Sequence, residues 1–475
     1  MKAIKYTGII FIVIACALGC KPIQTVQQPG SKPMPVSFDG GTDSTNSAAI
    51  SWKQFFTDKD LINLIDSALT TNWDVQMAYQ RIQAAQSAVL FAKGALKPIV
   101  DANALAGISK FGFYTMDGAG NKGTEIYNGK DIPKHLPDYF IGLQSTWEID
   151  LWGKLKNQKK AAIARFLSTV EGRNLIVTGL ISEMAASYYE LLTLDETLSI
   201  LDETIVLQQN AFEIVKVQKE AAVANELAVK QFEAQLLSVQ ALRQQVLQQI
   251  AETENKINFL AGRYPQPVIR DTSFFDNSLP AIMKTGIPSA LLQNRPDIRQ
   301  AEFDLVAAKA DVLSAKAAFY PSLNITGAGG LQAFKTGLLL STPESVAYNL
   351  FGSLTAPLIN RAAIKAEFNR VNAIQLETLY NYQKAIVNGY VEVHNEMLRI
   401  KNLERVFELK TKETNVLSQS IEISEELFKT GRANYLEVLF AQQNALQAKV
   451  ELIEAKKEQL LSTVNMYKAL GGGWR

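Results

Sequence analysis

Histidine and cysteine are nearly absent from this chain of 475 residues, which contains two of each. Both cysteines, Cys16 and Cys20, lie in the apolar N-terminal stretch, and the histidines, His135 and His394, are far apart in the sequence. A disulfide framework, a zinc site and a catalytic thiol therefore lack the residues that they need. No Ser/His/Asp arrangement has a plausible spacing either, so we expect no enzymatic activity, no cofactor and no metal site.

An excess of one charge is also missing. The chain has 48 basic and 47 acidic residues, which leaves a net charge of +1. A nucleic-acid-binding surface needs a basic excess, so no nucleic-acid partner is expected. After the N-terminal stretch no segment has 18 uninterrupted apolar residues, and the sequence predicts no transmembrane helix.

Proline is absent from two long tracts, 138–264 and 358–475. Helical periodicity in each tract predicts one very long helix, a polar break and a shorter returning helix. The expected ranges are 154–220, 221–225 and 226–260 in the first tract, and 364–429, 430–434 and 435–470 in the second. At about 1.5 Å per residue the longer helices extend on the order of 100 Å. Such helices do not fit within a compact domain.

The chain contains an internal duplication. Residues 67–107 match 289–330 once a single residue is inserted in the second copy. The shared positions are Ser67/Ser289, Asn72/Asn294, Asp74/Asp297, Ala78/Ala301, Ala84-Ala85/Ala307-Ala308, Lys93/Lys316 and Pro98/Pro321. VANEL at 223–227 then matches RANYL at 432–436, and FLAG at 259–262 matches ALGG at 469–472. A unit on the order of 200 residues is too long for a solenoid repeat and indicates a duplicated half-protein.

Each copy also predicts one hairpin of long strands. A helical segment that begins near Asp58 ends before Pro98, and alternation of apolar and polar residues replaces the helical period. The expected strands are 99–108 and 139–150 in the first copy and 323–331 and 348–356 in the second, with loops at 115–138 and 335–347. A half-buried sheet of a soluble protein is the alternative interpretation, but helices this long leave no compact core to cover it.

Strands of 9–11 residues suit a tilted bilayer crossing. Four strands cannot close a barrel, and an open edge in lipid leaves backbone groups without partners. Two chains would supply eight strands and a filled interior, whereas three chains would supply twelve strands and a lumen. We favour the trimer, with the long helices continuing the barrel as a tubular wall. An ordinary solvent-exposed coiled coil is the alternative for these helices.

The first 20 residues have the pattern of a targeting segment. Lys2 and Lys5 precede the apolar run 9–18, and Ala17-Leu18-Gly19 leads to Cys20. This pattern predicts a lipoprotein signal at 1–20 with lipidation of Cys20. Use of Cys16 and plain secretory cleavage are the alternatives. The Pro-, Gly- and Ser-rich residues that follow predict an extended tether.

The chain resembles the outer-membrane factors of tripartite efflux systems, the TolC-type channels, and most closely the lipoprotein branch that includes OprM and the NodT-like proteins. The motifs that carry the resemblance are W52-x-x-F55-F56, STWEIDLWGKL at 145–155, FLAGRYP at 259–265, the segment 287–323, TGRANYLEVLFAQQNAL at 430–446 and YKALGGGW at 467–474.

The resemblance implies a mainly α-helical fold with β-strands that cross the membrane. It implies a homotrimeric twelve-stranded barrel in outer-membrane lipid that continues into a periplasmic α-helical barrel. The implied segments are a signal peptide (1–20), a tether and equatorial segment (21–57), a first repeat (58–262, hairpin 98–150), an equatorial linker (263–288) and a second repeat (289–472, hairpin 321–357). The implied function is a passive exit duct that docks to a periplasmic adaptor and an inner-membrane pump, of the RND type.

The breaks between the paired helices become adaptor-docking tips under this interpretation. They comprise Ala222, Val223, Ala224 and Asn225 in the first copy and Gly431, Arg432, Ala433 and Asn434 in the second. The family's YLxxLDAQ segment forms rings at the closed end and corresponds here to 435–442, with Phe440 in place of the aspartate. Leu436, Phe440 and Gln443 are therefore the expected gate, closing by apolar contact and dewetting. Packing of Phe440 between helices is the alternative.

Two other motifs contain charged residues in suggestive order. In Asn294-Arg295-Pro296-Asp297, proline suits a first helical turn and the aspartate complements the helix dipole. In Trp147-Glu148-x-Asp150 we expect the carboxylates to face a lumen or a helix N-terminus.

A structural or adhesive periplasmic coiled-coil lipoprotein is the alternative function. The exported substrate is not encoded in any recognisable motif, although few methionines and histidines argue against soft metals.

Overall fold

Two helices, of 67 and 69 residues, set the length of the molecule. The computed structural model describes residues 33–38, 45–127, 129–271, 284–357, 359 and 361–475. The expected signal segment and its cysteines lie outside these residues. The long helices are α6 (Lys154–Glu220) and α11 (Arg361–Lys429), and each returns through a 35-residue helix, α7 (Glu226–Leu260) or α12 (Tyr435–Ala469). The predicted long helices and their breaks are confirmed.

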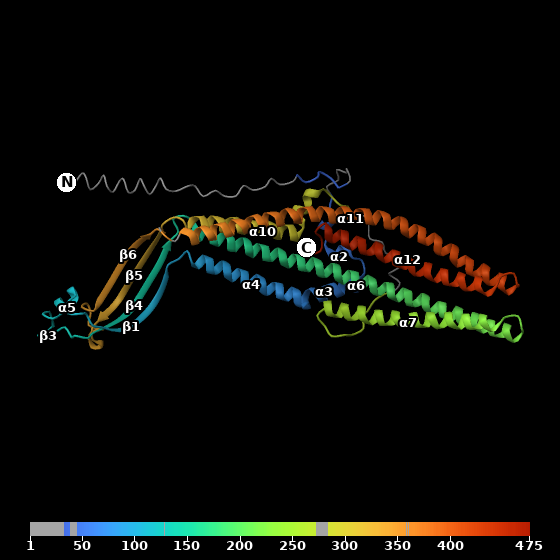
Figure 1. Ribbon diagram of the computed structural model, residues 1–475, viewed down its shortest axis with the longest axis horizontal. Helices are drawn as coiled ribbons and strands as arrows, with labels where there is room; N and C mark the ends of the chain where they lie inside the picture. The colour runs from blue at the N-terminus through green and yellow to red at the C-terminus, as the bar shows by residue number, and fades with distance from the viewer. Residues whose placement is uncertain (1–32, 39–44, 128, 272–283, 358, 360) are drawn as a thin grey trace.

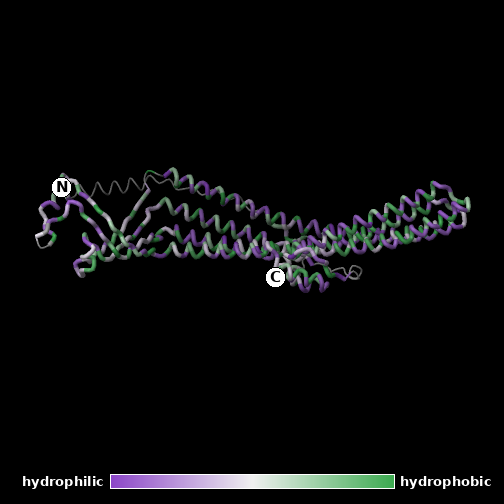
Figure 2. Tube along the Cα trace, turned by 90° about the horizontal axis from the view of Figure 1, so that it is seen from below, coloured by the Kyte–Doolittle hydropathy of each residue, from purple (hydrophilic) through white to green (hydrophobic). Residues whose placement is uncertain are grey.

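Figure 1 shows an elongated molecule with a sheet at one end and two helix turns at the other. The shorter helices α4 (Trp73–Gly94) and α10 (Pro296–Ala317) run beside α6 between the sheet and the middle of the molecule. There they meet α3 (Lys59–Thr71) and the ends of α7 and α12. Apolar and polar residues are interspersed along the long helices in Figure 2.

The sheet is antiparallel, with strand order β1-β4-β5-β6. Its strands are β1 (Ile99–Ser109), β4 (Leu136–Ile149), β5 (Ser322–Ala333) and β6 (Val346–Thr355). The central pair joins the two copies, from Tyr139 opposite Ala333 to Ile149 opposite Leu323. Within the described chain, β1 and β6 each pair on one side only.

The loop expected at 115–138 contains regular structure, so that part of the prediction is wrong. It folds into a short helix, α5 (Met116–Asn121), and two small strands, β2 (Glu125–Tyr127) and β3 (Lys130–Asp131). The Thr115 hydroxyl accepts a hydrogen bond from the Gly118 amide at 3.1 Å and caps the helix. The second loop contains only one turn of 3-10 helix, η3 (Thr336–Leu338).

The helix expected from Asp58 to Lys97 is interrupted at Asn72, which corrects the prediction. The Asn72 carboxamide accepts from the Asp74 amide at 2.9 Å, so it caps α4. Its Nδ2 donates to the carbonyl of Leu260 at the end of α7, also at 2.9 Å. The second copy breaks at the same place, because a short helix, α9 (Leu291–Asn294), precedes Pro296 at the start of α10.

The middle of the molecule has the largest apolar core. Trp52, Phe56, Tyr188 and Tyr467 are buried there among residues of α3, α6, α7 and α12. The ring of Phe55 stacks on Tyr467 at 4.0 Å, and the Tyr188 hydroxyl donates to Asp58 at 2.7 Å. Burial raises the pKa of Tyr467 to about 12. This core, called the belt below, holds α3, α6, α7 and α12 together with the segment that contains Trp52 and Phe56.

The core explains an apolar stretch in α6. By length and composition, 18 residues of this helix meet the requirement for a membrane span, with a mean hydropathy of 1.2. However, 67% of that stretch is buried inside the chain, which is typical of a core helix.

Glycines in the left-handed region end both returning helices at the core. Gly262 has φ 63° and Gly471 has φ 89°. A Cβ on Gly262 would lie 2.5 Å from the Thr71 carbonyl oxygen, and one on Gly471 would lie 2.6 Å from the backbone of Asn294. The structural equivalent of FLAG at 259–262 is therefore KALG at 468–471. The match with 469–472 is wrong by one residue, because the helix-terminating glycine sets the register.

The two turns at the far end share one geometry. The Val223 amide donates to the Gln218 carbonyl and the Arg432 amide to the Leu427 carbonyl, both at 2.8 Å. The residue with positive φ is Ala222 (59°) in the first turn and Gly431 (71°) in the second. Asn225 and Asn434 then cap the returning helices.

Substituting Gly431→Ala is expected to destabilise the second turn by about 1 kcal/mol, because a Cβ is disfavoured at positive φ. Hydrogen exchange of the amides at 427–436 should accelerate about fivefold. The control is Gly337→Ala, where a Cβ meets no atom within 4 Å. Equal exchange at 427–436 in both variants would contradict the assigned turn geometry.

Candidate functional site

The sheet has one apolar and one polar face, as the alternation predicted. The register places Ala102, Leu143, Gly329 and Tyr348 opposite one another across all four strands. The adjacent row on the other face is Asp101, Gln144, Ala328 and Asn349. On that face Asn103 donates to Gln144 at 3.2 Å. A sheet of this kind separates an apolar from an aqueous environment.

The N-terminus of α6 holds both carboxylates of the Trp147-Glu148-x-Asp150 motif. Asp150 accepts from the backbone amides of Leu155 at 3.0 Å and Lys156 at 2.8 Å. Glu148 forms an ion pair with Lys154 at 2.9 Å. The motif therefore fixes the passage from strand to helix, which was one of its two expected roles.

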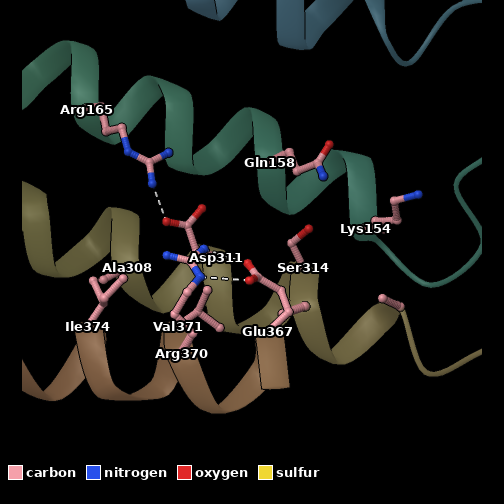
Figure 3. Close-up of a pocket in the computed structure, with 12 residues that line it drawn as sticks. Lys154, Gln158, Arg165, Ala308, Asp311, Ser314, Glu367, Arg370, Val371 and Ile374 are labelled. Atoms are coloured by element: carbon pink, nitrogen blue, oxygen red, sulfur yellow. Dashed lines mark hydrogen bonds and ion pairs between the residues drawn. The ribbon is translucent and has the colours of Figure 1, made fainter. Parts of the chain in front are cut away.

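A charged cavity of about 350 Å³ lies next to this passage, between α6, α10 and α11. Figure 3 shows Arg165 of α6 directed at Asp311 of α10, and Arg370 of α11 directed at Glu367 of the same helix. The first pair joins two helices and the second lies within one. These ion pairs are partly exposed, so they contribute little stability and keep the helix surfaces hydrophilic.

The Asn294-Arg295-Pro296-Asp297 motif is a structural junction. Pro296 occupies the first turn of α10, as predicted. The buried Arg295 guanidinium donates to Asp297 at 2.6 Å, to Glu392 of α11 at 2.7 Å and to the carbonyl of Ala469 at 2.8 Å. Arg295 thus connects the start of α10, the middle of α11 and the end of α12, a role that the motif alone did not indicate.

The two histidines lie apart. His135 precedes β4, and His394 lies in α11, where its ring stacks on Tyr390. Among the residues that the structure describes, no three His, Cys, Asp or Glu side chains group as metal ligands.

The expected gate residues share one exposed face of α12. Leu436, Phe440 and Gln443 are all exposed, and Phe440 is 60% exposed. The opposite face carries Val438, which is buried. Tyr435 and Leu439 pack against the cluster that contains Phe212 and Phe232 of α6 and α7. Phe440 is therefore outside the packed interior of its own chain.

The first copy presents a different surface at the same level. Glu226 forms an ion pair with Lys219, which lowers the pKa of the Glu226 carboxyl. Leu227 is exposed like Leu436, but Gln231 is half-buried where the second copy exposes Phe440. The apolar pair on one helix face is thus confined to the second copy.

The expected tip residues form the surface of the two turns. Val223, Asn225, Gly431, Arg432 and Asn434 are exposed, as is Ala222. Ala224 and Ala433 are half-buried. The tips therefore offer small and polar side chains, with Val223 as the largest exposed apolar one.

The family model of the outer membrane efflux protein matches residues 64–263 and 287–472. These two segments correspond to the two copies of the duplication.

Similar proteins cover almost the whole chain. It is 26% identical to the cation efflux system protein CusC of Escherichia coli over 471 residues, 98% of each chain. It is 28% identical to the pyoverdine export outer membrane protein OpmQ of Pseudomonas aeruginosa over 425 residues, 89% of this chain and 87% of that one. A solved CusC structure matches with a TM-score of 0.80 at 25% identity, covering 96% of this chain and 100% of that one.

The open MtrE outer membrane channel of Neisseria gonorrhoeae has the same fold, with a TM-score of 0.81 at 23% identity over 96% of this chain and 99% of that one. The family model, the relatives over nearly full length and the shared fold agree with one another. This chain belongs to the outer membrane efflux protein family.

Proposed function

We propose that three copies of this chain form a passive exit duct across the outer membrane, as part of an efflux system. The observation that carries the proposal is the four-stranded sheet with two open edges, continued by helices of 67 and 69 residues. An open edge in hydrocarbon leaves unsatisfied N–H and C=O groups, each costing several kcal/mol. Pairing of β6 with β1 of the next chain removes every edge.

The duplication supplies a template for that pairing. Strands β4 and β5 come from different copies and pair over eleven positions. Strand β6 of one chain and strand β1 of the next chain would pair in the same way, because they too come from the second and the first half of the duplication. Three chains of four strands make a barrel of twelve, wide enough for a lumen, whereas eight strands would fill with side chains.

The helices supply a second template. Within the chain, α6 of the first copy packs against α10 of the second, and the duplication makes α11 and α4 of the next chain the corresponding pair. Figure 1 shows α4 and α11 at opposite edges of the helical layer. Ala307 of α10 is 2% exposed, whereas its counterpart Ala84 of α4 is exposed. Contact with the next chain would bury Ala84 in the same way.

The remaining segments take their places along this duct. The apolar sheet face contacts outer-membrane lipid, and loops 115–138 and 335–347 face outward. The tips at 221–225 and 430–434 lie in the periplasm and dock to an adaptor, which connects them to an inner-membrane pump of the RND type. Residues 1–20 are a signal and Cys20 is lipidated, as the name of a relative from Salmonella typhimurium, probable outer membrane lipoprotein SilC, supports.

The pump, rather than the duct, selects the substrate in this proposal. The names of similar proteins mention cations, toluene and pyoverdine, which share no chemistry. In such a duct the choice among them falls to the pump.

The substitutions Leu436→Ala and Phe440→Ala are expected to raise single-channel conductance in planar bilayers, because they remove two apolar rings that close the tip by dewetting. Leu227→Ala is the matched control, since it removes an exposed leucine at the same level of the first copy. Unchanged conductance in both gate variants would exclude this gate.

The substitution Ala84→Arg is expected to dissociate the trimer, because an unpaired charge buried at each interface costs about 3 kcal/mol or more. The control is Gln83→Arg, since the counterpart of Gln83 is the exposed Val306. Native electrophoresis in mild detergent measures the oligomer. A stable trimer of the Ala84→Arg variant would place the interface elsewhere.

A further inference from the structure

Three aromatic side chains gather on the surface where the first copy ends. Trp73 at the start of α4, Phe259 at the end of α7 and Tyr264 just beyond it border a hollow of about 410 Å³. All three are exposed, and Tyr264 is 92% exposed. Rings of this size gain several kcal/mol when they are buried, so this aromatic cluster (Trp73, Phe259 and Tyr264) is suited to a docking contact.

A groove of about 600 Å³ lies on the opposite edge of the chain, along α10 and α11. Tyr380, Val387 and Val391 line it, and all three are exposed. The lining is mainly apolar, so the groove is suited to receive apolar side chains.

The end of the second copy shows which kind of segment lies against a long helix at this level. Its C-terminal residues Gly473 and Trp474 follow α12 as Tyr264 and Pro265 follow α7. A Cβ on Gly473 would lie 3.5 Å from the Cα of Thr178 in α6. Trp474 donates from its indole nitrogen to the Asn294 carbonyl at 3.1 Å. The segment after one returning helix thus lies against the long helix of the other copy.

The residue correspondence follows from the helix ends. Gly262 and Gly471 terminate α7 and α12, so Tyr264 corresponds to Gly473. Because α6 and α11 end at Glu220 and Lys429, Thr178 corresponds to Val387. Thr178 is 3% exposed and Val387 is 52% exposed. The same long-helix position is covered in one copy and open in the other.

The register also relates a pair of residues in the first copy to a pair in the second. In the first copy Arg173 of α6 donates to the hydroxyl of Tyr79 in α4 at 2.9 Å. The register equates these residues with Tyr382 of α11 and Glu302 of α10. Burial raises the pKa of Tyr382, and the Glu302 carboxylate lies close enough to raise it further.

We propose that the aromatic cluster of one chain docks into the α10–α11 groove of the next chain, with Tyr264 against Val387. The contact forms a latch at the middle of the duct, at the level of the belt core. The proposal rests on the assembly of several copies proposed above. The occupant is another molecule of the same protein, because the duplication already contains the corresponding contact within one chain.

The test is disulfide formation in the double variant Tyr264→Cys/Val387→Cys. The two positions lie on opposite edges of one chain, so a bond between them joins different chains. Oxidation is expected to produce covalent dimers and trimers on non-reducing gels, because the template contact lies within disulfide reach. The single variants Tyr264→Cys and Val387→Cys control for Cys16 and Cys20.

A position control uses Leu398, which is exposed on α11 and lies eleven residues beyond Val387, about 16 Å along the helix. Tyr264→Cys/Leu398→Cys is expected to remain uncrosslinked. In parallel, Tyr264→Ala should lower the temperature at which the native trimer dissociates, and Tyr264→Phe should restore it.

The outcomes distinguish the latch from the trimer assembly on which it rests. A wild-type protein that is not trimeric would overturn the assembly itself. A stable trimer without crosslinks in the Tyr264→Cys/Val387→Cys variant would overturn the latch alone. The groove would then bind the N-terminal segment or an adaptor instead. Phe38 already stacks on Tyr390 near this groove, at 5.2 Å.

Discussion

The unpaired edges of β1 and β6 are the constraint on which the rest of the account depends. A sheet with one apolar and one polar face is stable at a boundary between lipid and water, but only if its edges are paired. One chain supplies four strands and therefore cannot meet this requirement. Closure by further copies follows, and the long helices attached to each hairpin must then form a tube on the same axis.

The belt, the apolar core in the middle of the molecule, joins the two copies of the duplication within each chain. Tyr188 and Tyr467 are buried among segments from both copies. Asn72 and Arg295 each donate to the last carbonyl of the returning helix in their own copy, at Leu260 and Ala469. Helices that would be marginal alone thus gain their stability from tertiary contacts. The tips lie far from this belt and adjoin a smaller apolar cluster that contains Phe212 and Phe232.

Much of this fold was predictable because local signals decide it. The absence of proline and the Gly and Asn residues at the breaks located α6, α7, α11 and α12 within a few residues. The break at Asn72 was missed because apolar periodicity continues across it, and its second partner, Leu260, lies 188 residues away. Arg295 was missed for the same reason, since Glu392 lies 97 residues away. Ala84 and Ala307 show the remaining limit, because these identical residues differ in burial. In the proposed trimer the difference arises because Ala84 faces the next chain.

The most direct test is the mass of the wild-type complex, extracted in mild detergent and measured by native mass spectrometry. The account predicts three copies of the chain, which supply twelve strands and close the barrel around a lumen. A stable monomer would contradict it, because the edges of β1 and β6 would then be open in lipid. A stable dimer would also contradict it, since eight strands leave no room for an exit duct.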